Sequence, residues 1–445
     1  MSIQVYIAIG VLALVLLLII ERRKANNIPI WTSMLIGASL MVGLHVIDTG
    51  NALKAINLDV IIFLFGLFSI VSALDRSGVL KYVAAKMLDR ANSNVNSIMF
   101  IFVIGFGSLS AFLVNDAIAL LGIPLVIHIS KQIRVRPTVL FIALAFGISI
   151  GSVMTPVGNP QNLLIVIRSG ISLPFLTFIK WLIIPTILNL FLTYFILKVY
   201  FKKDLSKAVK EGNSRSEIIP TKDSELLSAN VITNPYLAKI SVIILLLTIA
   251  GFIISEVLQF LFHTVYLNIS GIAALGAIAL YALSNERREM LYNVDYSVLV
   301  FFAAMFVFTA ALWTSGLIPA IMSKIPNPVP DHNYRITNNA IISIVSLTLS
   351  QILSNVPFVA LYNNVMIYNG FNADDVSQWM MLASASTIAG NLTIFGAASN
   401  IIIIEAAEFK GVRAFSYIEF IKIGLMVTMI NIVVYYLFIT FSIWI

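Results

Sequence analysis

Long apolar segments recur from the beginning of this sequence to its end. A helix needs about 20 apolar residues to cross roughly 30 Å of hydrocarbon. The chain is 59% hydrophobic and only 11% charged, whereas a soluble domain is about 45–50% apolar and about 25% charged. The composition excludes a soluble or a disordered chain and predicts an all-α, multi-pass protein of the cell membrane (inner or plasma membrane). Ten segments are of spanning length: Ile3–Ile20, Pro29–Ile47, Asn57–Leu74, Val139–Ile167, Phe175–Tyr200, Leu237–Phe262, Val265–Leu283, Tyr296–Ile318, Trp379–Ile404 and Ile418–Ile445.

Two further apolar segments, 96–130 and 339–369, are too long for one span and too short for two spans with a turn. Basic residues, such as Lys86 and Lys131, flank the first of them on both sides. Lys and Arg mark cytoplasmic loops, so this segment is expected to enter and leave the membrane on one side. We predict that both segments are re-entrant helical hairpins, which protein or a wet cavity must surround.

The positions of the charged residues agree with the predicted membrane topology. With this topology both termini lie outside, and most of the 28 Lys and Arg residues lie on the cytoplasmic side. The net charge of +7 is therefore explained by membrane orientation, and no nucleic-acid partner is predicted. The polar stretch 201–236 is expected to be a cytoplasmic linker between two halves, 1–200 and 237–445.

The two halves repeat one another in sequence. Positions in the span 60–80 recur 238 residues later, and positions at the first hairpin recur 240 residues later in the second. The topology places the two copies in opposite orientations. An inverted repeat with broken helices indicates a secondary transporter with its site near the midplane. The matched pairs include Phe63 and Phe301, Gly78 and Gly316, Ser110 and Ser350, Asn115 and Asn355, Gly158 and Gly396, and Asn162 and Asn400.

Asp116 is the leading candidate for an ion-binding residue. Between Arg90 and Lys131 it is the only acidic or basic residue. A carboxylate within the membrane costs about 2.5–3.5 kcal/mol on insertion scales and usually marks an ion pathway. We expect Asp116 to bind a proton or sodium. A helix cap is the structural alternative, because Asn115 and Asp116 could satisfy free backbone amides at a helix start.

Two predicted spans, 139–167 and 379–404, contain helix-breaking residues. The first holds Thr155-Pro156-Val157-Gly158-Asn159-Pro160-Gln161-Asn162, where two prolines and a glycine must interrupt the helix. The freed carbonyls and amide side chains can replace the hydration shell of a solute. Hairpin tips and breaks together supply the predicted binding residues: Asn115, Asp116, Thr155, Gly158, Asn159, Asn162, Ser354, Asn355, Asn391, Thr393, Ser399 and Asn400.

These motifs resemble the ion transporter superfamily. Asn115-Asp116 at a hairpin tip, the Thr155–Asn162 motif and Gly396-Ala397-Ala398-Ser399-Asn400 are similar to the arsenite-efflux permease and citrate-transporter-like branch, which is related to the divalent anion/sodium symporters. The resemblance implies an elevator-type transporter, in which a moving unit carries both hairpin tips. It also implies proton coupling at Asp116 and suggests a homodimer.

We therefore predict a secondary active transporter, not an enzyme, with no cofactor and no metal centre. It moves a small anion or neutral oxyacid, arsenite-like or a carboxylate, coupled to protons. The alternative is a sodium-coupled di- or tricarboxylate symporter with sodium at Asn115, Asn159 and Asn355, although Val356 stands where that branch carries Thr. An ion channel is a third interpretation.

Two sequence features have a more ordinary explanation than chemistry. Gly147-Ile148-Ser149-Ile150-Gly151 matches the hydrolase pattern around a nucleophilic serine, but its glycines also form a helix-packing pair. Glu256 is close to the end of its span and is expected to be an interfacial charge.

Overall fold

The computed structural model describes residues 3–20, 28–89, 91, 94–206, 232–262, 268–322 and 327–441. Within these ranges the chain forms helices joined by turns and short loops, with no strand, which confirms the all-α prediction. Of the predicted linker, residues 207–231 lie outside the described residues.

In the described part of the chain, seven helices are long and apolar enough to cross a membrane. All but α18 overlap predicted spans and exceed them by at most two residues at either end; α18 was predicted as an arm of the second hairpin. Three other predicted spans form shorter apolar helices: α1 (Ile3–Ile20), α2 (Ile30–Gly43) and α14 (Ile269–Leu283). The seven are α4 (Leu58–Arg76), α9 with its 3₁₀ turn η2 (Pro137–Met154), α11 (Pro174–Tyr200), α13 (Pro235–Phe262), α16 (Tyr296–Thr314), α18 (Arg335–Leu353) and α22 (Tyr417–Phe441).

Two helices are shorter than their apolar segments because the backbone turns. The segment Pro29–Ile47 remains helical only to Gly43, and His45 then has a positive φ of 57°. The segment Tyr296–Ile318 ends its helix at Thr314, and Gly316 has a φ of 85°, a left-handed conformation that commonly ends helices. Hydrophobicity sets where a span lies, but the turn sets where its helix stops.

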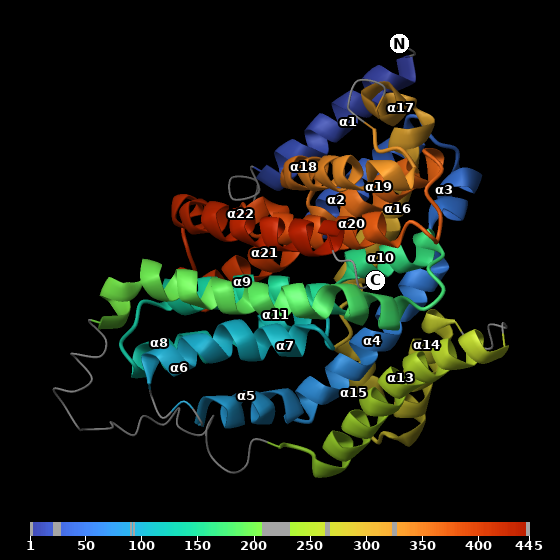
Figure 1. Ribbon diagram of the computed structural model, residues 1–445. Coiled ribbons are helices and arrows are strands. Elements are labelled where there is room, and N and C mark those ends of the chain that lie inside the picture. The colour runs from blue at the N-terminus through green and yellow to red at the C-terminus, as the bar shows by residue number, and fades with distance from the viewer. Residues whose placement is uncertain are drawn as a thin grey trace.

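Helices α1, α2, α4, α13, α14 and α16 form what we call the framework group. Its main contacts join the two halves of the chain, because α2 of the first half packs along α16 of the second, and α4 of the first half packs along α14 of the second (Figure 1). The contact between α4 and α14 is so close that a Cβ on Gly66 would lie only 2.6 Å from the carbonyl oxygen of Ala273. Four short helices accompany this group: α3 (Thr49–Ala55), α5 (Val79–Asp89), α15 (Arg287–Tyr292) and α17 (Leu317–Met322).

The remaining helices, which we call the inner group, comprise two hairpins, two broken helices, α11 and α22. The first hairpin has one arm of α6 (Val95–Phe100), a π-helical turn η1 (Ile101–Gly105) and α7 (Phe106–Ser110), and a second arm α8 (Asn115–Gln132). The second hairpin is α18, the single residue Ser354 and α19 (Asn355–Tyr368). The broken helices are α9–η2 with α10 (Pro160–Ser169), and α20 (Val376–Ala389) with η5 (Ile394–Gly396) and α21 (Ala398–Phe409).

Packing within the inner group is crossed between the halves. Each hairpin lies along the broken helix of its own half, α7 on α9 and α18 on α20. Each hairpin also contacts the broken helix of the other half, α8 on α21 and α19 on α10. Helices α9, α11, α20 and α22 lie together in the middle of the molecule (Figure 1). This arrangement brings the hairpin tips and the helix breaks of both halves into one region.

Candidate functional site

The tip of the first hairpin is bound to the break between α9 and α10. The backbone N–H of Asn115 donates to the carbonyl oxygen of Gly158 over 3.0 Å, and the Thr155 hydroxyl donates to the carbonyl oxygen of Ala111. A Cβ on Gly158 would collide with the carbonyl oxygen of Ser152. Glycine is therefore required here by a close backbone approach.

Two asparagines hold this break in shape. Asn159 Oδ1 accepts a hydrogen bond from the N–H of Asn162 over 2.9 Å, which caps α10. Asn162 Nδ2 donates to the carbonyl oxygens of Ser152 (3.2 Å) and Thr155 (2.9 Å). The side-chain amides thus replace the helical hydrogen bonds that the prolines remove.

The break between α20 and α21 uses the same bonds 238 positions later. Asn400 Nδ2 donates to the carbonyl oxygens of Gly390 (2.7 Å) and Thr393 (3.5 Å). The N–H of Gly396 donates to Thr393 O over 3.1 Å, as that of Gly158 does to Thr155 O over 3.4 Å. The two breaks are therefore built alike at the level of individual hydrogen bonds.

The second tip differs from the first in its backbone and in its link to the break. Ser354 has φ 67° and ψ 159°, a region that almost only glycine occupies and that costs about 1–3 kcal/mol elsewhere. Asn355 Oδ1 accepts from the N–H of Val356 over 2.9 Å. Gln351 joins tip and break, because its Nε2 donates to Ala389 O (2.9 Å) and its Oε1 accepts from the Thr393 hydroxyl (2.8 Å).

Thr387 of α20 joins the two halves. Its hydroxyl oxygen accepts from Asn159 Nδ2 (3.4 Å) and Gln161 Nε2 (3.2 Å), and its carbonyl oxygen accepts from the Ser149 hydroxyl (3.3 Å). Ser149 is fully buried, so it is not the water-exposed nucleophile that a hydrolase needs. Thr387 and Gln351 are not among the predicted binding residues, because both are ordinary polar residues within helices; only the tertiary contacts single them out.

Asp116 lies in the first turn of α8, half-buried at the helix N-terminus. The residue that precedes α8 is Val114, and no side chain caps the helix. The helix-cap interpretation of Asn115 and Asp116 is therefore wrong. In the part of the chain that the structure describes, no donor bonds to the Asp116 carboxylate.

Several buried polar atoms at the tips and breaks have no hydrogen-bond partner among the residues that the structure describes. In folded proteins about 90% or more of such atoms are paired, so each exception needs an explanation. For Asn162 and Asn400 the free atom is clearly the oxygen, because the nitrogen of each faces backbone carbonyls. The unpartnered atoms are Asn115 Oδ1, Asn162 Oδ1, both amide atoms of Asn391, Ser399 Oγ and Asn400 Oδ1.

The arrangement can hold a small solute through neutral groups. The polar side chains at the two tips and two breaks are amides and hydroxyls together with the single carboxylate of Asp116. Most of the free atoms are acceptors, which a hydroxylated solute can satisfy by donating hydrogen bonds. A hard cation is also bound by oxygen atoms of this kind.

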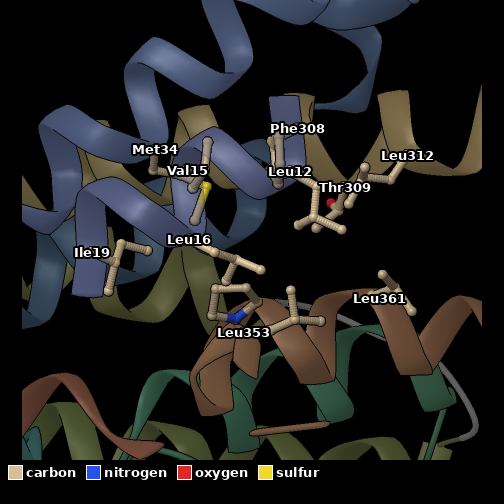
Figure 2. Close-up of a pocket in the computed structure, with 11 residues that line it drawn as sticks. Leu12, Val15, Leu16, Ile19, Met34, Phe308, Thr309, Leu312, Leu353 and Leu361 are labelled. Atoms are coloured by element: carbon tan, nitrogen blue, oxygen red, sulfur yellow. The ribbon is translucent and has the colours of Figure 1, made fainter. Parts of the chain in front are cut away.

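A small apolar cavity borders the second tip on the framework side. Leu353 and Leu361 of the hairpin face Leu12 and Leu16 of α1, with Phe308 of α16 behind them (Figure 2). Hydrocarbon lines almost all of this cavity, and the hydroxyl of its one polar residue, Thr309, already donates to the carbonyl oxygen of Met305. It is therefore an interface between the two groups of helices and not a site for a polar solute.

Glu256 is not the interfacial charge that the sequence predicts. Its side chain is buried on α13, and the carboxylate accepts from the N–H groups of Phe175 (2.6 Å) and Leu176 (3.2 Å) at the start of α11. A carboxylate at a helix N-terminus is favoured by the helix dipole. Glu256 therefore caps α11 from a neighbouring helix, a contact that linear sequence does not reveal.

Comparison with known proteins identifies the family. The sequence model of a family described as citrate transporters matches residues 15–370. The chain belongs to the citrate transporter family. The resemblance to citrate-transporter-like proteins is thus confirmed, and the protein is a multi-pass membrane transporter.

Individual relatives of this citrate transporter family member extend over most of its length. An uncharacterized transporter of Mycobacterium tuberculosis is 28% identical and covers 89% of this chain and 90% of its own. The silicon efflux transporter LSI3 of Oryza sativa subsp. japonica is 26% identical, covering 84% of each chain. The putative transporter arsB of Dictyostelium discoideum is 24% identical and covers 97% of this chain and 92% of its own.

Proposed function

We propose that this protein is a secondary active transporter that moves a small oxyacid or carboxylate across the membrane, coupled to protons. The observation that carries the proposal is the set of unpartnered amide and hydroxyl groups at two matched helix breaks, next to one carboxylate. Buried polar groups are normally paired in folded proteins, so a site of this kind suits a solute that supplies the missing partners.

Most of the unpartnered groups are hydrogen-bond acceptors, and this favours a neutral, hydroxyl-bearing solute. The oxygens of Asn115, Asn162 and Asn400 are acceptors without donors, and the polar groups of the tips and breaks include no cationic side chain. A multiply charged carboxylate would meet acceptors where it needs donors. The names of the rice and Dictyostelium relatives, a silicon efflux transporter and an arsB, accord with an uncharged oxyacid such as silicic or arsenous acid.

We further propose that Asp116 carries the coupling proton and that residues 1–200 and 237–445 are inverted repeats. The matched hydrogen bonds of Asn162 and Asn400 support the repeat. In an elevator mechanism the inner group, which carries both tips, would move against the framework group. The apolar cavity between α1, α16 and the second hairpin is the kind of dry surface over which such sliding occurs.

A sodium-coupled carboxylate symporter is the second candidate, because free amide oxygens also suit sodium. Of the three proposed sodium-binding residues, Asn159 and Asn355 already have oxygens that accept backbone N–H groups. Only Asn115 retains an unpartnered oxygen, and this supports the proton over sodium.

The test is uptake into proteoliposomes of arsenite, silicic acid, citrate and succinate, with imposed proton or sodium gradients. A proton gradient should drive uptake of one neutral oxyacid, and Asp116→Asn should abolish this coupling while the protein stays folded. Wild-type coupling in Asp116→Asn, or uptake that requires sodium, would exclude the proposal. Single-channel currents without saturable exchange would instead indicate a channel.

A further inference from the structure

The second hairpin contains a group of buried polar side chains well away from its tip. Within the described ranges of the chain, these atoms have no hydrogen-bond partner: both amide atoms of Asn363 and the hydroxyls of Tyr362, Ser346 and Ser350. All four side chains are completely buried. We call them the hairpin polar group.

Their positions place them inside the inner group of helices. Ser346 and Tyr362 are each eight residues from Ser354, so they lie at similar depth on the two arms, about 12 Å along the helices from the tip. Pro357 and Leu361 share the face of α19 that borders the apolar cavity, and helical periodicity turns Asn363 away from that face. The buried sides of the arms pack on α20 and α10.

The first hairpin shows that the fold does not require three of these four side chains to be polar; the fourth, Ser350, matches Ser110, whose hydroxyl lies 2.8 Å from the carbonyl oxygens of Gly107 and Ile148. At the matching places of the first hairpin, 240 positions earlier, Phe106 stands for Ser346, Gly122 for Tyr362 and Ile123 for Asn363. There Phe106 stacks on Phe102 with ring centroids 5.0 Å apart, and a Cβ on Gly122 would lie 2.5 Å from the side chain of Leu144. Tightly packed hydrocarbon there fills the places that match Ser346, Tyr362 and Asn363.

We propose that the hairpin polar group binds internal water. The three hydroxyls can each donate and accept a hydrogen bond. The Asn363 amide accepts through its oxygen and donates through its nitrogen. A ligand that both donates and accepts is needed, and water with two to four such partners is the usual occupant of buried polar sites. A cation would leave the hydroxyl and amide hydrogens unpaired, and an anion would leave the oxygens unpaired.

The same face of α18 continues this polar character toward the start of the hairpin. Asn339, Ser343, Ser346 and Ser350 follow one another at intervals of three or four residues, which places them on one side of the helix. Asn339 retains an unpartnered oxygen, and the Ser343 hydroxyl donates to the carbonyl oxygen of Asn339. Water bound along this face connects the outer end of α18 with the tip. If the proposed function holds, this is the route by which the tip region exchanges protons with that side of the membrane.

Three tyrosines allow a direct test by radiolytic hydroxyl labelling of the purified protein, because radicals formed from bound water label the side chains beside it. Tyr368 is 80% exposed and serves as the wet reference. Tyr435 is completely buried, with its hydroxyl 2.6 Å from that of Thr186, and serves as the dry reference. Tyr362 should be labelled several-fold faster than Tyr435 despite equal burial. Labelling of Tyr362 at the rate of Tyr435 would overturn the proposal.

The variant Asn363→Ile introduces the residue that the first hairpin carries at this place. It should lower Tyr362 labelling to the level of Tyr435, leave arsenite or silicic acid binding unchanged, and slow proton-driven uptake several-fold. Thr348→Val, on the exposed side of α18, is the control and should change none of these. Reduced labelling with unchanged uptake would overturn the proton route. A wild-type protein that lacks proton coupling would contradict the proposed function and leave the labelling result standing.

Discussion

Asn159 at the first break has both amide atoms bonded, and the other asparagines of the two breaks fall into two kinds. Asn162 and Asn400 use their amide nitrogens to hold the chain in its broken shape and offer only their oxygens. The side chain of Asn391 makes no hydrogen bond to any described residue, although it is fully buried. The structure therefore separates residues that maintain the site from a residue that is free to bind.

Replacing Asn400 or Asn391 by the similarly sized leucine should have different effects on the free energy of unfolding. Asn400→Leu leaves the carbonyl oxygens of Gly390 and Thr393 without their donor and should lower the free energy of unfolding by about 1–3 kcal/mol. Asn391→Leu removes an unpaired amide and should keep or raise stability while solute binding is lost. Thermal unfolding in detergent and a binding assay measure both. Equal destabilisation by the two variants would contradict this division.

The strained backbone of Ser354 makes a second prediction at this scale. Ser354→Gly should raise the free energy of unfolding by about 1 kcal/mol, because glycine adopts the observed φ of 67° and ψ of 159° without strain. Val114, at the matching place in the first hairpin, has φ −52° and ψ 130°. Val114→Gly should therefore lower stability, by about 0.5–1 kcal/mol. Denaturation of the two variants side by side checks the sign of each change, and a loss of stability in Ser354→Gly would refute the strain argument.

Glycines set the distance between neighbouring elements of the inner group. A Cβ on Gly147 would lie 2.7 Å from the carbonyl oxygen of Phe102, and one on Gly151 would overlap the backbone of Gly107. The glycine pair in the hydrolase-like motif thus allows α9 to contact the first hairpin backbone to backbone, which is the helix-packing role.

Gly151→Ala should consequently separate α7 from α9 and destabilise the protein by about 3 kcal/mol. Gly10→Ala is the matched control, since nothing lies within 4 Å of a Cβ there. That change should stabilise α1 by up to about 1 kcal/mol. Melting temperatures distinguish the two, and similar behaviour would show that the close contact is not limiting.

The elements were largely predictable from sequence, but their ends and partners were not. Hydrophobicity locates the broken helices, and prolines mark the break in the first while Gly390 and Gly396 mark it in the second; the observed breaks, at 155–159 and 390–397, lie within the predicted spans. The end of α2 at Gly43, by contrast, depends on the turn at His45. The capping of α11 by Glu256 joins residues 80 positions apart, and no local pattern encodes such a distance.

At the scale of the whole molecule, the proposed movement of the inner group against the framework group can be tested by cross-linking. The chain has no cysteine, so introduced cysteines react without background. Leu16→Cys with Leu353→Cys joins α1 to the second hairpin across the apolar cavity (Figure 2). A short bifunctional maleimide should abolish uptake in this variant.

The control pair is Leu12→Cys with Met34→Cys, because both residues line the same cavity but belong to the framework group. Cross-linking them should leave uptake intact. Continued transport by the cross-linked Leu16–Leu353 pair would show that these two groups do not move apart during the cycle.

By itself the sequence determined that this is an all-helical membrane protein, where its helices break, and which single acidic residue lies within the first hairpin. These properties follow from the free-energy cost of placing charge and unpaired backbone groups in hydrocarbon. That cost depends on each residue and its near neighbours in the sequence. Only the tertiary structure decided which polar atoms remain free. Asn162 and Asn400 look alike in sequence to Asn159 and Asn355, yet their oxygens lack partners while those of the latter are used. Hydrogen-bond satisfaction depends on neighbours brought together from both halves, so it is fixed by packing and not by position in the chain.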